Sequence, residues 1–429
     1  MGKEYIVDNQ ITSEFVDEYT KTTYRIVGNN KHSAVKPCYW LEQRLMTGRD
    51  NRNCYKGIFG VESHRCLQNT PSLPFCNHQC VFCWRDINIG NLGSDFTVEP
   101  DDPKFLIKEM IRHQKDIIKN HLPLRRYLNN YEIMIDILNH MLISDSPQSI
   151  NSFSSAIHTS KNKIERAVTL LKNQEFIKPI DENQTIYKIC PDIASSIENR
   201  EEIELLINRA LTSPDDIMQA HIEALRPNHA AISLDGEPML YPLISEFIRE
   251  FRNRDMTSFV VTNGTLPNRL ENLETLPSQL YITLPAPNKN LYQKVCRPMI
   301  KNGWNKIMDS ISLLDSLNCR SLIRLTAVRD LNINENLLES YHKIVEEGNP
   351  NFFEIKGFTL QARALEINQR LKSDRDVKSF FPDYDYLRNL ALQFQEISGY
   401  PLIYENEASR DFLFAVNWDE NKDPKITAV

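Results

Sequence analysis

From about residue 215 onward, the chain alternates between short apolar stretches and longer amphipathic ones. We expect buried strands at 229–234, 258–263, 280–284, 321–328 and 352–357. Helical stretches such as 243–254 and 304–318 lie between them. Connections of this length suit right-handed crossovers between parallel strands. The pattern therefore predicts an α/β fold, in which functional side chains gather at the carboxyl ends of the strands.

The cysteines are concentrated in one segment. Six of the nine lie between Cys38 and Cys83, and we interpret the other three, Cys190, Cys296 and Cys319, as small buried hydrophobes. The sequence has no run of about 18 apolar residues, and its first residues lack the apolar core of a secretory signal. We therefore expect a cytoplasmic protein without a membrane span, in which clustered thiols bind metal rather than form disulfides.

Three of these cysteines form the motif Cys76-x3-Cys80-x2-Cys83. Three thiolates on one short loop predict a [4Fe–4S] cluster with one iron left open. That iron can bind S-adenosylmethionine, and one electron from the cluster then gives a 5′-deoxyadenosyl radical. Phe82 is expected to pack on the cluster. A structural zinc site, with His78 or Cys66 as the fourth ligand, is the alternative.

Polar residues lie at the ends of three of the predicted strands. Gly236-Glu237-Pro238 follows the first strand, where acidic and carbonyl groups can receive the methionine ammonium. Thr262-Asn263 ends the second strand and offers polar groups for the carboxylate or ribose. Thr283 ends the third. We expect all of these residues to bind S-adenosylmethionine, although each motif alone would read as an ordinary turn.

Cys38, Cys54 and Cys66 remain, in a segment (36–90) that we expect to consist of loops held by metal. Three further thiolates suggest a second [4Fe–4S] cluster with an open iron. Lys56 follows Cys54 closely, and a lysine beside an electropositive cluster would have a lowered pKa, as Schiff-base chemistry requires. The alternative for Lys56 is an exposed residue that forms a salt bridge.

Residues 128–195 show a different order of expected helices and strands. Helices are expected near 131–143, after Ser146-Pro147, and over 161–174, followed by a hairpin formed by 176–180 and 185–189. This order is that of a winged helix-turn-helix. Such modules bind nucleic acid or protein, or brace a fold, and the sequence leaves these roles open. We therefore divide the chain into 1–127 (extension, cysteine segment and start of the barrel), the insertion 128–195, and the remainder of the barrel, 196–429.

The net charge is −7, but ten Lys and Arg residues stand against three acids between Lys21 and Arg85. This local excess of positive charge fits an anionic substrate beside the metal site. The alternative is a set of solvated charges that offset electron-rich clusters.

Several motifs together resemble the tRNA 4-demethylwyosine synthases, the radical S-adenosylmethionine enzymes of wybutosine biosynthesis. The resemblance spans about 24–122 and 212–415. It rests on Cys54-Tyr55-Lys56, on the stretch from Cys76 to Arg85, and on the stretches 24–28, 33–38, 63–68, 227–234, 236–238, 262–264, 297–298, 303–304, 324–326, 354–357 and 409–410.

The resemblance implies a partial (βα)6 radical S-adenosylmethionine barrel with the winged-helix-like segment inserted. It also implies a carbon–carbon lyase that converts N1-methylguanosine at position 37 of tRNA(Phe), together with pyruvate, into tricyclic 4-demethylwyosine. The implied partners are the tRNA(Phe) anticodon region, pyruvate held by Lys56 or by the open iron of the second cluster, and an electron donor. The donor would be a separate flavodoxin- or ferredoxin-like protein, because the chain has no room for the flavodoxin-like domain of the eukaryotic members.

Two other functions are weighed against this one. A two-cluster radical enzyme could act on a different substrate, which the basic segment disfavours. An iron–sulfur sensor with a winged helix could bind DNA as a redox regulator. The two motifs Gly236-Glu237-Pro238 and Thr262-Asn263 would then have no purpose.

Overall fold

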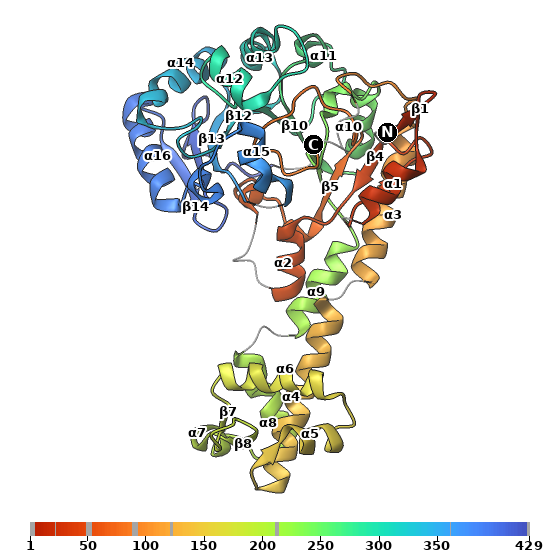
Figure 1. Cartoon of the computed structure of the whole chain (residues 1–429), viewed down its shortest axis with the longest axis vertical. Coiled ribbons are helices and arrows are strands. Elements are labelled where there is room, and N and C mark those ends of the chain that lie inside the picture. Colours follow the sequence, from red (N-terminus) through yellow and green to blue (C-terminus); the bar gives the residue numbers. More distant parts are fainter. Residues whose placement is uncertain are drawn as a thin grey trace. The chain divides into compact units, whose positions relative to one another are not determined.

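The computed structural model describes residues 5–21, 23–48, 54–87, 93–120, 123–210, 214–360 and 362–426. The chain divides into two compact units (Figure 1). The sheet unit contains 1–38, 53–116 and 226–429. The insertion unit contains 39–52 and 117–225, a wider segment than the predicted 128–195.

A ten-stranded sheet forms the centre of the sheet unit, in the order β14-β15-β13-β12-β11-β10-β9-β5-β4-β3. Its strands are β3 (Arg25–Val27), β4 (Ser33–Val35), β5 (Cys66–Thr70), β9 (His229–Ile232), β10 (Thr257–Thr262), β11 (Gln279–Thr283), β12 (Arg320–Ala327), β13 (Phe352–Gly357), β14 (Leu402–Asn406) and β15 (Asp411–Ala415). The strands from β5 to β13 along this order pair in parallel. They confirm the predicted α/β barrel, and antiparallel strands extend the sheet at both edges.

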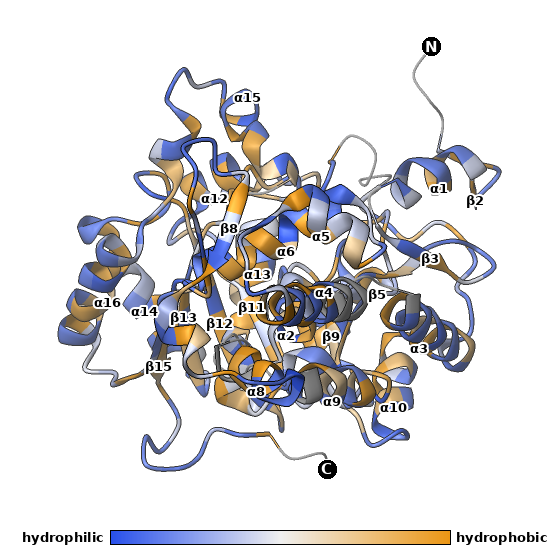
Figure 2. Cartoon of the chain, turned by 90° about the horizontal axis from the view of Figure 1, so that it is seen from below, coloured by the Kyte–Doolittle hydropathy of each residue, from blue (hydrophilic) through white to orange (hydrophobic). Residues whose placement is uncertain are grey.

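Helices follow these strands and cover the sheet. The helices of this unit are α1 (Ser13–Thr20), α3 (Pro103–Asn120), α10 (Ile244–Arg252), α11 (Pro267–Glu271), α12 (Lys289–Cys296), α13 (Gly303–Ser312), α14 (Leu338–Gly348), α15 (Ile367–Leu371) and α16 (Tyr384–Ser398). A two-stranded ribbon, β1 (Ile6–Val7) and β2 (Gln10–Ile11), precedes α1. On α10, Ile244, Phe247, Ile248 and Phe251 are buried at helical spacing. Figure 2 shows the matching pattern, with polar colour on the outer turns of α14 and α16.

The cysteine segment is more regular than the sequence suggested. Cys66 begins β5, the first parallel strand of the barrel, which pairs with β9 in register Cys66↔His229. Only five residues form this strand and four of them are buried, so the sequence shows no polar–apolar alternation. The expectation of loops throughout 36–90 was wrong at this strand, and at α2 (Tyr39–Thr47) in the insertion unit.

The insertion unit has the element order of a winged helix. Its elements after α2 are α4 (Pro123–Ser144), β6 (Gln148–Ser149), α5 (Ile150–Ala156), α6 (Lys161–Asn173), β7 (Ile177–Pro179), β8 (Ile186–Ile189), α7 (Pro191–Ala194), α8 (Arg200–Ala210) and α9 (Pro214–Ala224). The hairpin β7–β8 is joined by β6 into a three-stranded sheet. Ile164, Val168 and Leu171 of α6 pack with Ile137 and Met141 of α4 in a separate core. The sequence did not predict β6, which is two residues long.

Among the described residues, no helix is long and apolar enough to cross a membrane.

Candidate functional site

The loop that carries Cys76, Cys80 and Cys83 lines a cavity of about 210 Å³ at the carboxyl ends of the parallel strands. The same cavity is lined by five residues that the sequence assigned to S-adenosylmethionine: Gly236, Glu237, Thr262, Asn263 and Thr283. Pro238 is not among the lining residues; it begins a short 3₁₀ helix, Pro238–Leu240. The fold therefore brings three thiols and the polar strand ends to one place.

Glu237 ties two strand-end loops together. Its carboxylate accepts hydrogen bonds from the Thr262 hydroxyl (2.6 Å), the Asn263 backbone N–H (2.8 Å) and the Met239 backbone N–H (3.0 Å). Burial raises the pKa of Glu237, and these hydrogen bonds oppose that rise. The Glu237 side chain therefore accepts hydrogen bonds that hold the loops after β9 and β10 together.

The position of Gly236 has no room for a side chain. Its φ is +72°, and a Cβ atom there would lie 2.0 Å from the Ser72 carbonyl oxygen. Only glycine permits this close approach without a shift of the backbone. The approach keeps the 72–76 segment, which leads into the cysteine loop, against the end of β9.

A buried ion pair stands beside the cysteine loop. Arg85 Nε lies 3.6 Å from Asp235 Oδ1, and Tyr24 donates a hydrogen bond of 3.1 Å to Asp235. Burial raises the pKa of Asp235 to about 6, although Arg85 and Tyr24 oppose the rise. Burial also raises the pKa of the Cys76 thiol to about 11 and that of Cys83 to about 12, with Arg85 opposing. Bound metal cations would offset the charge of such thiolates, so the donor set fits an iron–sulfur cluster.

The charges of the other three cysteines of the segment influence one another. Burial raises the pKa of Cys54 to about 11 and that of Cys66 to about 12, and the charge of Cys38 adds to both shifts. Cys54 caps the 3₁₀ helix Tyr55–Phe59 and accepts a hydrogen bond of 3.3 Å from the Lys56 backbone N–H. Buried thiols whose charges raise one another's pKa would gain from a bound metal cation.

Lys56 is buried, with 3% of its surface exposed, so the alternative of an exposed salt-bridging lysine was wrong. Its Nζ lies 5.3 Å from the centroid of the Phe259 ring and 5.8 Å from that of Tyr281. Burial lowers the pKa of Lys56, but Tyr55, Cys66 and Cys54 outweigh burial, and the pKa is raised. The expected lowering of the pKa was wrong, because thiols rather than cationic iron lie beside the amine.

Arg324 on β12 is a neighbour of Lys56 that was not predicted from the sequence. Its Cζ lies 4.6 Å from the ring centroids of both Tyr55 and Tyr281, the rings that Lys56 also faces. Its guanidinium pairs with Glu354 of β13, while Nη2 is buried and has no hydrogen-bond partner in the described part of the chain. A charged residue inside an apolar parallel strand was the available signal. No local signal marks Arg370, which binds the cysteine loop from α15.

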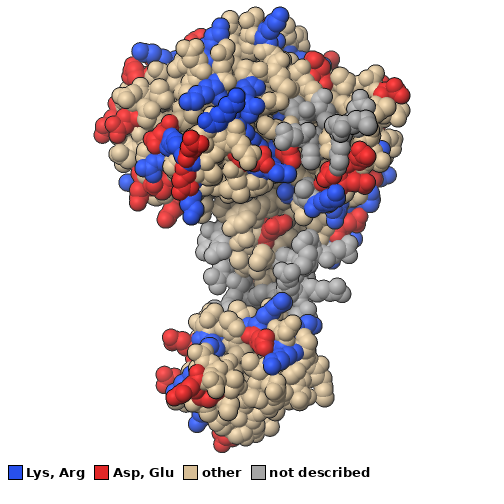
Figure 3. Space-filling model, viewed as in Figure 1, with Lys and Arg blue, Asp and Glu red and all other residues tan. Residues whose placement is uncertain are grey.

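The basic segment predicted between Lys21 and Arg85 does not form one surface. Lys56 and Arg85 are buried, and Arg49 and Arg52 lie outside the described residues. Lys and Arg side chains gather instead on the face that carries α12 and α15 (Figure 3).

A larger cavity of about 690 Å³ lies at the amino ends of β10 to β13, against residues 417–426. It contains none of the predicted site residues. The chemistry of parallel α/β folds lies at the opposite, carboxyl end, and we assign the site there.

The barrel and its cysteine loop define a radical S-adenosylmethionine protein, and the Radical SAM superfamily profile matches residues 197–344. The tRNA 4-demethylwyosine synthase of Pyrococcus abyssi is 30% identical over 97% of this chain and 92% of its own length. The human enzyme is 28% identical over 81% of this chain and 34% of its own length. The chain belongs to the tRNA 4-demethylwyosine synthase family, radical S-adenosylmethionine enzymes of wybutosine biosynthesis.

Two solved structures share the fold. One is described as the structure of TYW1 with a lysine–pyruvate adduct bound; it has a TM-score of 0.62 and 24% identity, and the match covers 97% of this chain and 100% of that one. The other is a crystal structure of archaeal TYW1, with a TM-score of 0.57, 23% identity and the same coverage.

Proposed function

We propose that this chain is a carbon–carbon lyase with two [4Fe–4S] clusters that joins pyruvate to N1-methylguanosine-37 of tRNA(Phe) and forms 4-demethylwyosine. The observation that carries the proposal is the pairing of two separate cysteine sets with one buried lysine. Cys76, Cys80 and Cys83 line the cavity at the strand ends, whereas Cys54 and Cys66 lie beside Lys56.

Cys76, Cys80 and Cys83 would hold the first cluster, which with S-adenosylmethionine supplies the 5′-deoxyadenosyl radical when both are bound. Gly236, Thr262, Asn263 and Thr283 would contact S-adenosylmethionine from the cavity wall. Glu237 and Pro238 would act by shaping this wall. The Glu237 carboxylate already accepts three hydrogen bonds, so the methionine ammonium would be received by carbonyl groups of this loop.

Cys38, Cys54 and Cys66 would hold the second cluster, and Lys56 would bind pyruvate as a Schiff base. Because the pKa of Lys56 is raised, its ammonium group must first lose a proton. The free amine then attacks the keto carbon, a C=N bond forms, and the keto oxygen leaves as water. The surrounding rings of Phe259 and Tyr281 limit access of water, which favours the imine over its hydrolysis. The lysine–pyruvate adduct named for the solved TYW1 structure supports this role.

Arg324 would bind the carboxylate of the pyruvate unit on Lys56. The Nη2 group of Arg324 is buried and has no hydrogen-bond partner among the described residues, whereas Glu354 already pairs with the same guanidinium. A buried donor without an acceptor costs free energy, which a carboxylate ligand would recover.

The tRNA would approach the carboxyl ends of the strands, where α12 and α15 present Lys and Arg side chains (Figure 3). Clustered positive charge is the electrostatic footprint of a nucleic-acid site. A separate flavodoxin- or ferredoxin-like donor and a cytoplasmic location stay predictions from the sequence.

The direct test is mass spectrometry of tRNA(Phe) after anaerobic incubation with reduced protein, S-adenosylmethionine and pyruvate. We expect Cys83→Ala to abolish cleavage of S-adenosylmethionine to 5′-deoxyadenosine. Cys54→Ala should retain much of this cleavage but form no tricyclic base. Base formation by Cys54→Ala would refute the second cluster.

Lys56→Arg tests the Schiff base, because arginine keeps the positive charge but cannot form the imine. We expect no tricyclic base from this variant. We also expect borohydride to trap a pyruvate adduct in the unsubstituted protein and not in Lys56→Arg. Full activity of Lys56→Arg would rule out the Schiff base.

A further inference from the structure

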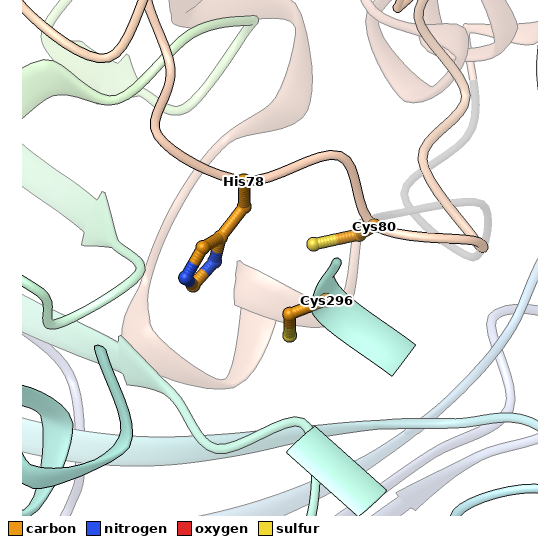
Figure 4. A group of neighbouring side chains, drawn as sticks. All are labelled: His78, Cys80 and Cys296. Atoms are coloured by element: carbon orange, nitrogen blue, oxygen red, sulfur yellow. The ribbon is translucent and has the colours of Figure 1, made fainter. Parts of the chain in front are cut away.

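A small group of side chains surrounds Cys80 on one side of the cysteine loop. The ligand atoms of His78, Cys80 and Cys296 all lie within 4.8 Å of one another (Figure 4). His78 and Cys296 have 3% and 1% of their surfaces exposed. From its sequence context Cys296 is expected to be a small buried hydrophobe; it is buried, and its thiol lies beside a predicted cluster ligand.

The backbone holds Cys296 opposite Cys80. The Gln79 N–H donates a hydrogen bond of 2.9 Å to the Cys296 carbonyl, and the Val81 N–H donates one of 2.9 Å to the Val295 carbonyl. These two bonds flank Cys80 and join the loop to the last turn of α12. Because both backbones are fixed, the two thiols have little freedom to move apart.

His78 is held from the same helix. Its Nε2 lies 2.7 Å from the hydroxyl of Tyr292, which is four residues before Cys296 on α12 and therefore on the same face. A Cβ atom on Gly303 would lie 2.1 Å from the Tyr292 hydroxyl, so the packing of α13 leaves this hydroxyl little room to move. Tyr292 and Cys296 thus act on the loop as one rigid pair.

Only one of the two thiols, Cys80 and Cys296, can donate a hydrogen bond to the other. A Cys80 sulfur that binds iron has lost its proton, whereas Cys296 lies outside the Cys76-x3-Cys80-x2-Cys83 motif and keeps its thiol hydrogen. Cys80 is therefore the thiolate acceptor and Cys296 the thiol donor.

We propose that Cys296, assisted by His78, is a positioning residue that donates a hydrogen bond to the Cys80 sulfur and raises the reduction potential of the radical-generating cluster. The inference rests on the proposed role of Cys80 as a cluster ligand. Reduction adds negative charge to a cluster and its thiolates, so a donor to a ligand sulfur stabilises the reduced form. This hydrogen bond would make the cluster easier for its electron donor to reduce.

The test is an anaerobic redox titration of the reconstituted full chain, monitored by the electron paramagnetic resonance signal that changes when S-adenosylmethionine is added. That response separates the first cluster from any second one. We expect Cys296→Ala to lower the ratio of reduced to oxidised cluster about tenfold at a fixed potential, which is 59 mV for a one-electron couple. Cys296→Ser keeps a donor and should restore most of this shift. Cys319→Ala, which removes a thiol at the amino end of β12, is the matched control and should leave the potential unchanged.

An unchanged potential in Cys296→Ala would overturn the inference. Loss of iron and sulfide from both the Ala and the Ser variant would also overturn it, because Cys296 would then be needed to hold metal rather than to tune it. The proposed function fails separately: its failure would be a wild-type protein with the responsive cluster signal but no tricyclic base.

Discussion

Arg370 Nη1 donates a hydrogen bond of 2.6 Å to the carbonyl oxygen of Cys83, although 287 residues separate the two in the chain. The same guanidinium reaches the carbonyls of Cys80, Val81 and Arg85 at 3.3 to 3.4 Å. One side chain of α15 therefore gathers the carbonyls of the loop on which the radical chemistry depends.

Replacing Arg370 by Lys should weaken this loop, because a lysine keeps the charge but lacks the planar fork that reaches several carbonyls. Hydrogen bonds from a charged donor are worth about 1.5–3 kcal/mol. We expect lower iron content after reconstitution and faster loss of the cluster, measured by iron and sulfide analysis. Arg375→Lys, at an exposed residue paired with Asp330, is the control. Equal iron content in both variants would contradict the assigned role.

Gly236→Ala adds only one methyl group but should strongly disturb the S-adenosylmethionine site. The added Cβ would meet the Ser72 carbonyl at 2.0 Å, and a positive φ costs a non-glycine residue about 1–3 kcal/mol. We expect weaker binding of S-adenosylmethionine, measured by equilibrium dialysis, and a lower melting temperature. Gly399→Ala is a useful comparison, because its φ is also positive (+72°) but, among the residues that the structure describes, nothing lies within 4 Å of its added Cβ. Similar losses in the two variants would show that strain alone, and not the close approach, matters.

Arg324→Gln should raise the KM for pyruvate about 10- to 100-fold, since the loss of a charge-assisted hydrogen bond costs about 1.5–3 kcal/mol. Cleavage of S-adenosylmethionine should change little. The readout is the rate of tricyclic base formation over a range of pyruvate concentrations. Arg320→Gln, on the same strand but against Phe59, Phe352 and Trp418, serves as the control. An unchanged KM for Arg324→Gln would remove Arg324 from the pyruvate site.

His229 should make the stability of the chain depend on pH. Burial, with Arg65, His64 and Lys56 nearby, lowers the pKa of His229 from 6.5 to about 4. A lowered folded-state pKa means that the unfolded chain takes up the proton first. The stability from this residue is therefore present above pH 6.5 and is lost as the pH falls through about 4, by roughly 3 kcal/mol in total. His229→Asn should flatten this part of the pH profile, measured by thermal unfolding of cluster-free protein between pH 7 and pH 4.5. A profile equally steep in the variant would contradict the assignment.

The sequence by itself determined the features that depend on residues close together in the chain. The spacing of Cys76, Cys80 and Cys83 lies within one loop, and the alternation of strands and helices after residue 215 predicts a parallel sheet without any knowledge of packing. The same holds for the winged-helix order, where helical periodicity in 161–174 identified the buried face of α6.

Only the tertiary structure decided which distant side chains meet. Cys296 lies beside Cys80, and Arg324 faces the same rings as Lys56, because strand register and crossover packing bring residues more than 200 positions apart to one place. Strand β5 was missed for a related reason: its two faces are both buried, so its five residues carry no alternation. Contacts of this kind have no local sequence signal, since each residue is compatible with many environments until the sheet is assembled.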